Sequence, residues 1–204
     1  MQYHLNGFVP GNLQLSESVR SKSTRQKYKQ IPDKTDVLII GCGPAGLTLA
    51  RQLSVFPEIK TCIIESKPGP LLFGRADGVS CRTIEIMEAY NSSELILKES
   101  YWLNQISYWD SDSKNQNKIV CTRKVNDPRI GLSEFPHVVL NQARIHDLLL
   151  DGMKNSSCQL EPNYNCELID IEFNKKTYND PSKFPITATV LQKKNKKNYK
   201  KEIS

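Results

Sequence analysis

A glycine-rich segment early in the chain has the spacing of a dinucleotide-binding loop. It reads Gly-Cys-Gly-Pro-Ala-Gly over residues 41–46, and Glu65 follows nineteen positions after its last glycine. In such a loop the first glycine allows a tight turn, the second lets a pyrophosphate approach the backbone, and the third lets helix and strand pack closely. N–H groups at the start of the following helix face the phosphate, and the acid accepts a hydrogen bond from a ribose hydroxyl. The segment therefore predicts a dinucleotide site.

The residues on either side of the loop predict the strand, turn, helix and strand that this motif requires. Residues 37–40 are an apolar run typical of a strand buried on both faces. From Pro44 on, the pattern of Leu47, Leu49, Ala50 and Leu53 is compatible with a buried helix, which Pro57 ends. Residues 61–64 supply a second apolar strand, which ends at Glu65. A parallel pair needs this kind of crossover connection, so we expect an α/β fold of the doubly wound, Rossmann-like kind.

The remaining elements follow from hydrophobic periodicity. We expect helices at 81–89 and 93–99, with Asn91 as a left-handed stop between them, and then a hairpin of 106–109 with 119–122. A strand at 138–140 is followed by a helix that carries Ile145, Leu148, Leu149 and Met153 on one face. Two further strands are expected at 168–171 and 186–191. Residues 1–34 are expected to form an irregular arm outside the core, and residues 35–204 a domain that is incomplete at its C-terminus. The strand at 186–191 is interpreted as the first arm of a hairpin whose partner is barely begun.

Charge and cysteine content disfavour several functional classes. The formal charge is +6, but residues 1–35 and 192–204 carry twelve basic and three acidic residues, which leaves residues 36–191 at −3. No basic face for nucleic acid is therefore expected on the folded part, and the lysine-rich end is interpreted as a solvated loop or strand edge. The six cysteines show no metal-ligand spacing with histidine, and Cys42 is interpreted as a small filler. Without an apolar run long enough to span a bilayer or a signal peptide, we expect a soluble, cytoplasmic protein.

A second segment resembles a known family. Residues 74–85 read Gly-Arg-Ala-Asp-Gly-Val-Ser-Cys-Arg-Thr-Ile-Glu and resemble the flavin-contacting loop and following helix of the class A flavoprotein aromatic monooxygenases. Residues 135–147 and the opening residues 1–8 are similar to the phenol 2-monooxygenase and 3-hydroxybenzoate 4-monooxygenase group within it. The resemblance covers essentially the whole chain. It implies an FAD-dependent enzyme that hydroxylates a phenolic substrate with NADPH or NADH and O2, in a homodimeric full-length protein.

The resemblance also implies roles for individual residues. Those expected to bind the cofactor are Gly41, Gly43, Pro44, Ala45, Gly46, Glu65, Ser66, Lys67, Gly74, Arg75, Ala76, Asp77, Gly78, Val79 and Gln142. Glu65 to Lys67 would hold the adenosine ribose, residues 74–79 would wrap the flavin, and Gln142 would contact it from the start of its helix. Asp77 matches the catalytic aspartate that hydrogen-bonds the substrate phenol, and His137 matches a substrate-pocket histidine. A carboxylate that draws the phenolic proton makes the ring electron-rich, as electrophilic oxygen transfer requires.

Each of these residues has a purely structural alternative. Asp77 precedes a glycine and suits a turn, and His137 suits a satisfied histidine beside a strand. Arg82 either contacts a flavin phosphate or pairs with Glu85 or Glu88. The group more often has Gln at the position of Arg75, which weakens the assignment of substrate more than that of flavin.

Two other functions remain open at the level of sequence. One is a truncated, inactive FAD-binding remnant or interaction module, because the family's later Asp-Gly and Gly-Asp motifs, its substrate-binding Tyr and Lys or Arg, and a thioredoxin-like domain are expected after Ser204. The other is an NAD-dependent dehydrogenase, because an acid at Glu65 disfavours a 2′-phosphate but accepts FAD and NAD equally. A dehydrogenase would need a catalytic His or a Tyr-x-x-x-Lys arrangement, which the chain lacks after the second strand. A flavin disulfide reductase would need a redox cysteine pair, but Cys81 stands alone.

Overall fold

The computed structural model describes residues 31–127, 131–177, 180, 182–194 and 197–204. These residues form two compact units. The glycine-loop unit comprises residues 31–72 and 146–204, and the hairpin unit comprises residues 73–145. The similarity at residues 1–8 and most of the expected N-terminal arm fall outside the described residues.

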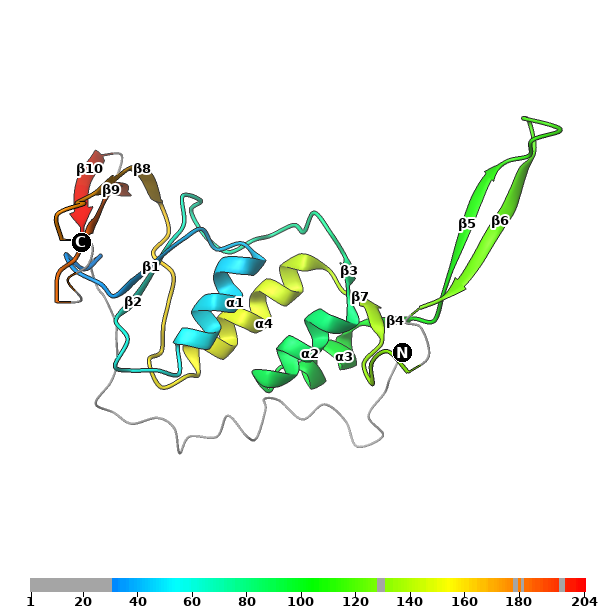
Figure 1. Ribbon diagram of the computed structural model, residues 1–204, viewed down its shortest axis with the longest axis horizontal. Coiled ribbons are helices and arrows are strands. Elements are labelled where there is room, and N and C mark those ends of the chain that lie inside the picture. The colour runs from blue at the N-terminus through cyan, green and yellow to red at the C-terminus, as the bar shows by residue number, and fades with distance from the viewer. Residues whose placement is uncertain (1–30, 128–130, 178–179, 181, 195–196) are drawn as a thin grey trace. The chain divides into compact units, whose positions relative to one another are not determined.

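The glycine-loop unit begins with the predicted parallel strand pair. Strand β1 (Val37–Ile40) pairs with β2 (Thr61–Ile64) in register from Val37 opposite Thr61 to Ile40 opposite Ile64, and helix α1 (Pro44–Leu53) connects them (Figure 1). All four residues of β2 are buried, but Ile40 of β1 is 48% exposed. The prediction that the first strand is buried on both faces is therefore wrong at Ile40, whose side chain borders a surface hollow.

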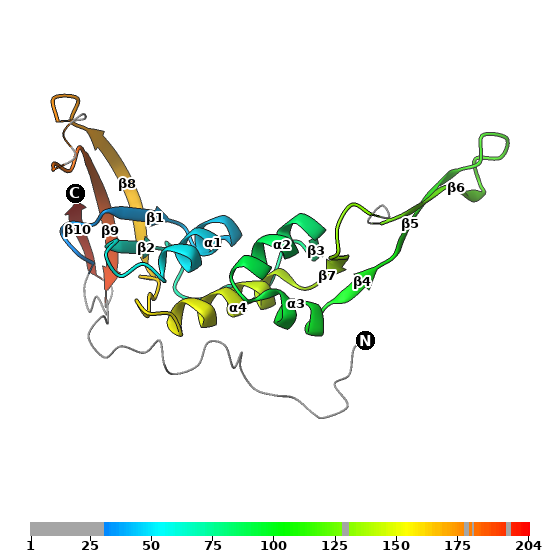
Figure 2. The same cartoon turned by 60° about the horizontal axis from the view of Figure 1, so that its bottom comes forward.

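A three-stranded antiparallel sheet completes this unit (Figure 2). Its order is β10 (Lys197–Ile203), β9 (Ile186–Lys194) and β8 (Cys166–Phe173). The expectation that the last hairpin is barely begun is wrong, because all seven residues of β10 pair with β9 and Ile203 is buried. The basic segment continues the two strands, and β10 lies at an edge of this sheet.

The core of the glycine-loop unit joins the parallel pair to the antiparallel sheet. Its apolar cluster consists of Ile31, Cys62, Ile64, Cys166, Val190 and Ile203. Ile31 is 1% exposed, although the sequence placed residues 1–34 outside the core. The backbone explains the difference, because Thr35 N–H donates to Ser204 O and Ser204 N–H donates to Asp33 O, both at 2.9 Å. These bonds hold the segment at residues 31–35 against β10.

Helix α4 (Gln142–Lys154) begins in the hairpin unit and continues into the glycine-loop unit, where it packs against α1. A Cβ atom on Gly152 would lie 2.5 Å from Nε of Arg51, so the absence of a side chain at Gly152 makes room for Arg51. Arg51 is buried in α1 with Leu47 and Ala50, whereas Leu49 is 47% exposed. The apolar pattern predicted the helix correctly but assigned Leu49 to the wrong face.

The hairpin unit contains two short helices and antiparallel strands. Helices α2 (Cys81–Ala89) and α3 (Ser93–Glu99) have the predicted bounds, and Asn91 between them has the predicted left-handed backbone, with φ 54°. Strands β3 (Gly78–Val79), β7 (His137–Val139) and β4 (Tyr101–Leu103) form one sheet in that order. Strands β5 (Gln105–Ser111) and β6 (Ile119–Asn126) form the predicted hairpin.

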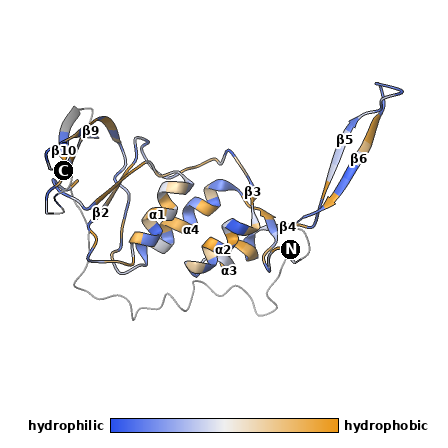
Figure 3. Ribbon diagram, viewed as in Figure 1, coloured by the Kyte–Doolittle hydropathy of each residue, from blue (hydrophilic) through white to orange (hydrophobic). Residues whose placement is uncertain are grey.

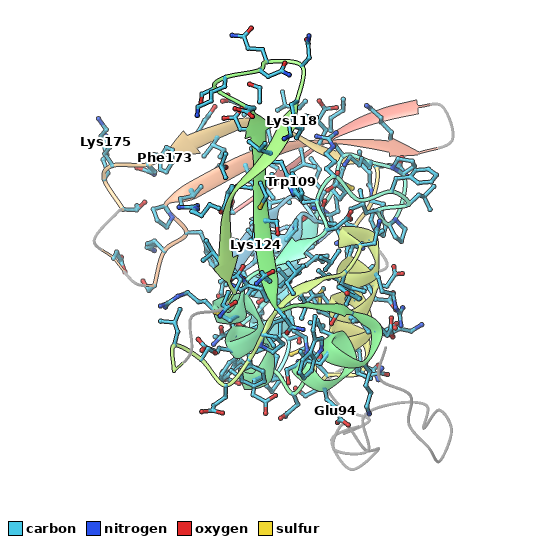
Figure 4. All side chains as sticks on the ribbon, turned by 90° about the vertical axis from the view of Figure 1, so that its right-hand side faces the viewer. Glu94, Trp109, Lys118, Lys124, Phe173 and Lys175 are labelled. Carbon is cyan, nitrogen blue, oxygen red and sulfur yellow. The ribbon has the colours of Figure 1, made fainter. Side chains whose placement is uncertain are left out.

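The hairpin of β5 and β6 exposes apolar as well as polar side chains. Figure 3 shows apolar and hydrophilic residues interspersed along its strands, and Figure 4 labels Trp109, Lys118 and Lys124 on it. Trp109 is 63% exposed and Ile119 is 71% exposed. The Arg123 guanidinium lies 4.2 Å from the ring centre of Tyr108, across the two strands.

We predict that Gly46→Ala destabilises the chain. The added Cβ would lie 2.1 Å from the carbonyl oxygen of Gly41, a backbone atom that cannot move without opening the turn. We expect a loss of about 3 kcal/mol in the free energy of unfolding measured with urea, at the upper end for overpacking. Gly69→Ala is the control, since a Cβ there meets nothing within 4 Å, and it should change stability by less than about 0.5 kcal/mol. Equal stabilities of the two variants would contradict the packing.

Candidate functional site

The turn between β1 and α1 has the geometry of an anion site. Gly41 has φ +96°, which favours glycine, and its N–H donates to Ile64 O at 2.8 Å. Gly43 is the N-cap residue of α1, and a Cβ built on it meets nothing within 4 Å. Among the described residues, no side chain caps this helix start and no acid occupies its first turn. The N-terminus of α1 therefore presents backbone N–H groups and a partial positive charge to open space.

Glu65 lies beside this turn and is tied to it. Its Oε2 accepts a hydrogen bond from Cys42 N–H at 2.8 Å, and its Oε1 accepts from Lys67 N–H at 3.0 Å and from Ser66 Oγ at 3.2 Å. Burial opposes ionisation of this carboxyl group, but these hydrogen bonds and the charge of Lys67 outweigh it and lower the pKa of Glu65. The residue is an ionised acceptor at neutral pH, as a ribose-binding acid must be.

Cys42 sits inside the turn as a buried thiol. Burial, and secondarily the negative charge of Glu65, raise the pKa of Cys42 to about 12. A thiol that stays protonated is a poor nucleophile and a poor metal ligand, which supports the interpretation of Cys42 as a small filler. Among the residues that the structure describes, no cluster of three or more His, Cys, Asp or Glu side chains could hold a metal ion.

The segment expected to contact flavin lies in the hairpin unit and meets Gln142 there. Gln142 Oε1 accepts from Arg75 N–H at 2.8 Å, and Gln142 N–H donates to Ala76 O at 3.2 Å. A Cβ on Gly74 would lie 2.8 Å from Cβ of Gln142, so only glycine allows this approach. Residues separated by 67 positions are thus brought together, while their contact with flavin stays a prediction. Residues 75–78 are exposed, whereas Val79 is buried and contributes to the core rather than to an open surface.

Asp77 and His137 are positioned by the same small sheet but are not brought together. Asp77 O accepts from Leu140 N–H at 2.8 Å, which extends the pairing of β3 with β7. In this register Asp77 lies opposite Leu140, and paired residues share a face of the sheet. Side chains alternate between the two faces along a strand, and His137 is three positions from Leu140, so His137 lies on the opposite face from Asp77. The Nδ1 atom of His137 lies 2.6 Å from Oδ2 of Asp127.

The alternative pairings of Arg82 are not formed. Glu85 accepts a hydrogen bond from Ser133 Oγ at 2.6 Å, and Glu88 accepts one from the Ser93 hydroxyl. Arg82 itself is exposed on α2.

Sequence reasoning missed two residues of the glycine-loop unit. His146 and Tyr164 lie near Cys42 and Glu65, and the pKa values of both side chains are influenced by these two residues. His146 is 5% exposed. Hydrophobic periodicity indicated only that His146 follows Ile145 on a helix, and no local sequence pattern marked Tyr164. Their place near Cys42 and Glu65 depends on how α4 and the chain after it pack.

A separate apolar hollow of about 260 Å³ lies in the glycine-loop unit. Its lining includes the exposed side chains of Ile40, Ile171, Phe173, Phe184 and Ile186. Figure 4 labels Phe173 at the end of β8. None of the predicted cofactor or substrate residues lines this hollow.

A parallel strand pair with a glycine turn, an open helix N-terminus and an acid after the second strand defines a dinucleotide-binding α/β protein. Residues 34–175 match the family model described as FAD binding domain, and the chain belongs to this FAD-binding domain family. FAD is therefore the cofactor of the family, and the resemblance deduced from residues 74–85 is confirmed at the family level.

Individual relatives are flavin-dependent monooxygenases. The chain is 45% identical over 190 residues to 3-hydroxybenzoate 4-monooxygenase of Comamonas testosteroni. The aligned segment covers 93% of this chain and 29% of that protein. It is 35% identical to an FAD-dependent monooxygenase of Aspergillus terreus, over 78% of this chain and 26% of that one. The chain therefore spans less than a third of the length of these relatives.

Solved structures share the fold. A flavin-dependent monooxygenase, PieE, in complex with FAD and substrate superposes with a TM-score of 0.65 at 19% identity, over 85% of this chain and 30% of that chain. The p-nitrophenol 4-monooxygenase of Pseudomonas putida superposes with a TM-score of 0.64 at 14% identity, over 84% of this chain and 40% of that chain. The predicted class, a Rossmann-like α/β fold with additional antiparallel strands, is confirmed. In the described part of the chain, no helix is long and apolar enough to cross a bilayer.

We predict that Glu65→Gln destabilises the chain in a pH-dependent way. The folded pKa of Glu65 lies below its usual 4.5, so its contribution is fully present above pH 4.5 and is lost as pH falls through the folded value. The difference in unfolding free energy between the original chain and the variant should therefore be largest near neutral pH and should vanish in acid. The exposed acid Glu161 is the control, and Glu161→Gln should show no such difference. A loss that is independent of pH would contradict the hydrogen bonding at Glu65.

Proposed function

We propose that this chain is the FAD-binding part of an aromatic monooxygenase, which hydroxylates a phenolic substrate with NADPH or NADH and O2. The observation that carries the proposal is the turn at residues 41–46, open above Gly43 and flanked by the ionised Glu65. The identity of 45% to 3-hydroxybenzoate 4-monooxygenase supports the reaction and the phenolic class of substrate.

The described residues fit FAD in two parts. In the glycine-loop unit, the residues of the turn (Gly41, Gly43, Pro44, Ala45 and Gly46) would hold the pyrophosphate, because the helix N-terminus there offers N–H donors without a competing cap. Glu65 would accept from a ribose hydroxyl, with Ser66 and Lys67 beside it. In the hairpin unit, the loop at 74–79 and Gln142 would contact the flavin.

Bound FAD would accept the reducing equivalents of NAD(P)H and activate O2 for transfer to the ring. The chain would supply Asp77, whose exposed carboxylate can accept the phenolic proton and so make the ring electron-rich. The short distance from His137 to Asp127 and its place on the opposite face from Asp77 favour a structural role for His137 over the substrate contact that the resemblance implied. A homodimeric assembly and a cytoplasmic location also belong to this proposal.

The apolar hollow favours one alternative, an FAD-binding remnant or module that associates with other protein. Side chains such as Phe173, which is 65% exposed, are of the kind found in protein interfaces. An NAD-dependent dehydrogenase has no comparable support, since the matching family and both relatives are flavin-dependent.

We predict that the purified chain retains FAD through gel filtration and quenches its fluorescence. NAD should compete poorly, and NADP still less because Glu65 would repel a 2′-phosphate. Gly43→Ala should weaken FAD binding by about tenfold or more, because its methyl group would occupy the space above the turn. Gly69→Ala should bind like the original chain. A folded chain that stays colourless with FAD would refute the proposal, and a preference for NAD would support the dehydrogenase.

A further inference from the structure

A bidentate ion pair joins the end of α3 to the first turn of α4 in the hairpin unit. Arg144 Nε donates to Glu99 Oε2 at 2.5 Å, and Arg144 Nη2 donates to Glu99 Oε1 at 2.8 Å. The Arg144 side chain is 41% exposed and the Glu99 side chain is 31% exposed. Two parallel bonds between a guanidinium and a carboxylate fix the orientation of both groups, which a single contact between surface charges does not. The pair therefore holds the two helix ends in one geometry.

The strand pairing of this unit brings the two residues together. Glu99 is the last residue of α3 and lies two positions before Tyr101, the first residue of β4. Tyr101 lies opposite Val139, the last residue of β7, after which the chain enters α4. Because β4 and β7 are antiparallel, the chain before β4 and the chain after β7 lie at the same end of the pair. The ion pair closes this end.

Arg144 is unfavourably placed for the stability of α4 itself. It lies in the first turn of the helix, where the macrodipole favours an acid over a base. Glu99 supplies the opposite charge from another helix, and its hydrogen bonds to Arg144 lower the pKa of Glu99 against the opposing effect of burial. Both members are therefore charged at neutral pH. This placement indicates that the pair contributes a tie between the helices rather than a gain for α4 alone.

The first turn of α4 in turn holds the loop that is expected to contact flavin. Gln142 Oε1 accepts from Arg75 N–H at 2.8 Å, and Gln142 N–H donates to Ala76 O at 3.2 Å. Just before the helix, Leu140 N–H donates to Asp77 O at 2.8 Å. All three loop residues are exposed, so packing contributes little to their position. The shape of the loop thus depends on where the start of α4 lies.

We propose that Glu99 and Arg144 are positioning residues for the loop at 74–79: their ion pair fixes the first turn of α4, and Gln142 in that turn fixes the loop in the shape that would contact flavin. The inference rests on the proposed binding of FAD by this chain. The pair acts through Gln142 and is not itself assigned a contact with the cofactor.

The test uses a charge swap in the full 204-residue chain. Arg144→Glu and Glu99→Arg each place two like charges together, and the double variant restores an ion pair with its direction reversed. Lys98→Gln is the matched control, because Lys98 pairs with Glu94 at 2.5 Å on the same helix α3. It removes a neighbouring ion pair without touching α4.

For each variant we would measure the dissociation constants of FAD and of ADP and the unfolding free energy in urea. ADP is the part of FAD without the flavin, so it reports on the glycine turn alone. In the chain without ligand, the exchange rates of the Arg75 and Gln142 amides report on the loop, and that of the Gly41 amide reports on the other unit.

We expect Arg144→Glu to weaken FAD by about fivefold, the upper range for a partly exposed ion pair, and to speed exchange of the Arg75 and Gln142 amides. ADP binding should stay within about twofold, and the Gly41 amide should exchange as in the original chain. The double variant should recover most of the FAD affinity, and Lys98→Gln should bind FAD like the original. An equal loss for FAD and ADP, or a loss in Lys98→Gln as large as in Arg144→Glu, would overturn the positioning role.

The amide exchange rates separate this inference from the proposed function. If the original chain binds neither FAD nor ADP, the proposed function fails, and the hold of the ion pair on the loop is judged on Arg75 and Gln142 alone. Exchange rates unchanged by Arg144→Glu would then overturn it. If the original chain binds FAD and Arg144→Glu binds it equally well, only the positioning role fails.

Discussion

The hydrogen bond from Gly41 N–H to Ile64 O is the contact on which the candidate site depends. It continues the parallel pairing of β1 with β2 by one residue, beyond the last pair of Ile40 with Ile64. Because both strands end at the same edge, the glycine turn that follows β1 and the acid that follows β2 are brought side by side. The bond from Cys42 N–H to Glu65 then joins them directly. The anion site and the ribose site are thus two consequences of a single strand register.

The rest of the glycine-loop unit supports that register. The core cluster packs Ile64 of β2 against Cys166, Val190 and Ile203 of the antiparallel sheet. Gly46 lets α1 approach β1, and Gly152 lets α4 approach α1 around the buried Arg51. The two glycines have the same physical purpose at different interfaces, which is to let a helix pack where a side chain would collide. In the hairpin unit Gly74 does the same between the 74–79 loop and Gln142.

Sequence was sufficient where the determinants are local. The parallel pair, the helices at 81–89 and 93–99, the left-handed Asn91 and the β5–β6 hairpin all follow from periodicity and turn chemistry. It was insufficient where burial depends on distant segments. Ile31 joins the core only because β10 lies beside it, Ile40 stays exposed beside a hollow, and β10 forms from a lysine-rich stretch without an apolar pattern. The same holds for the site: the loop and Glu65 have a spacing signature, whereas no sequence pattern places the buried His146 near Cys42 and Glu65. The roles carried over by resemblance stay predictions: Gln142 meets the 74–79 loop, and His137 lies on the opposite face of the strand pair from Asp77.

The most direct measurement is a titration of the isotopically labelled chain with FAD, followed by the amide signals in a nitrogen–proton correlation spectrum. If the pyrophosphate binds at the start of α1, the amide signals of Gly41, Gly43 and Ala45 shift with saturation, while those of Gly69 and Gly131 stay in place. Shifts confined to residues around the apolar hollow, such as Ala188 and Ile203, would contradict binding at the glycine turn.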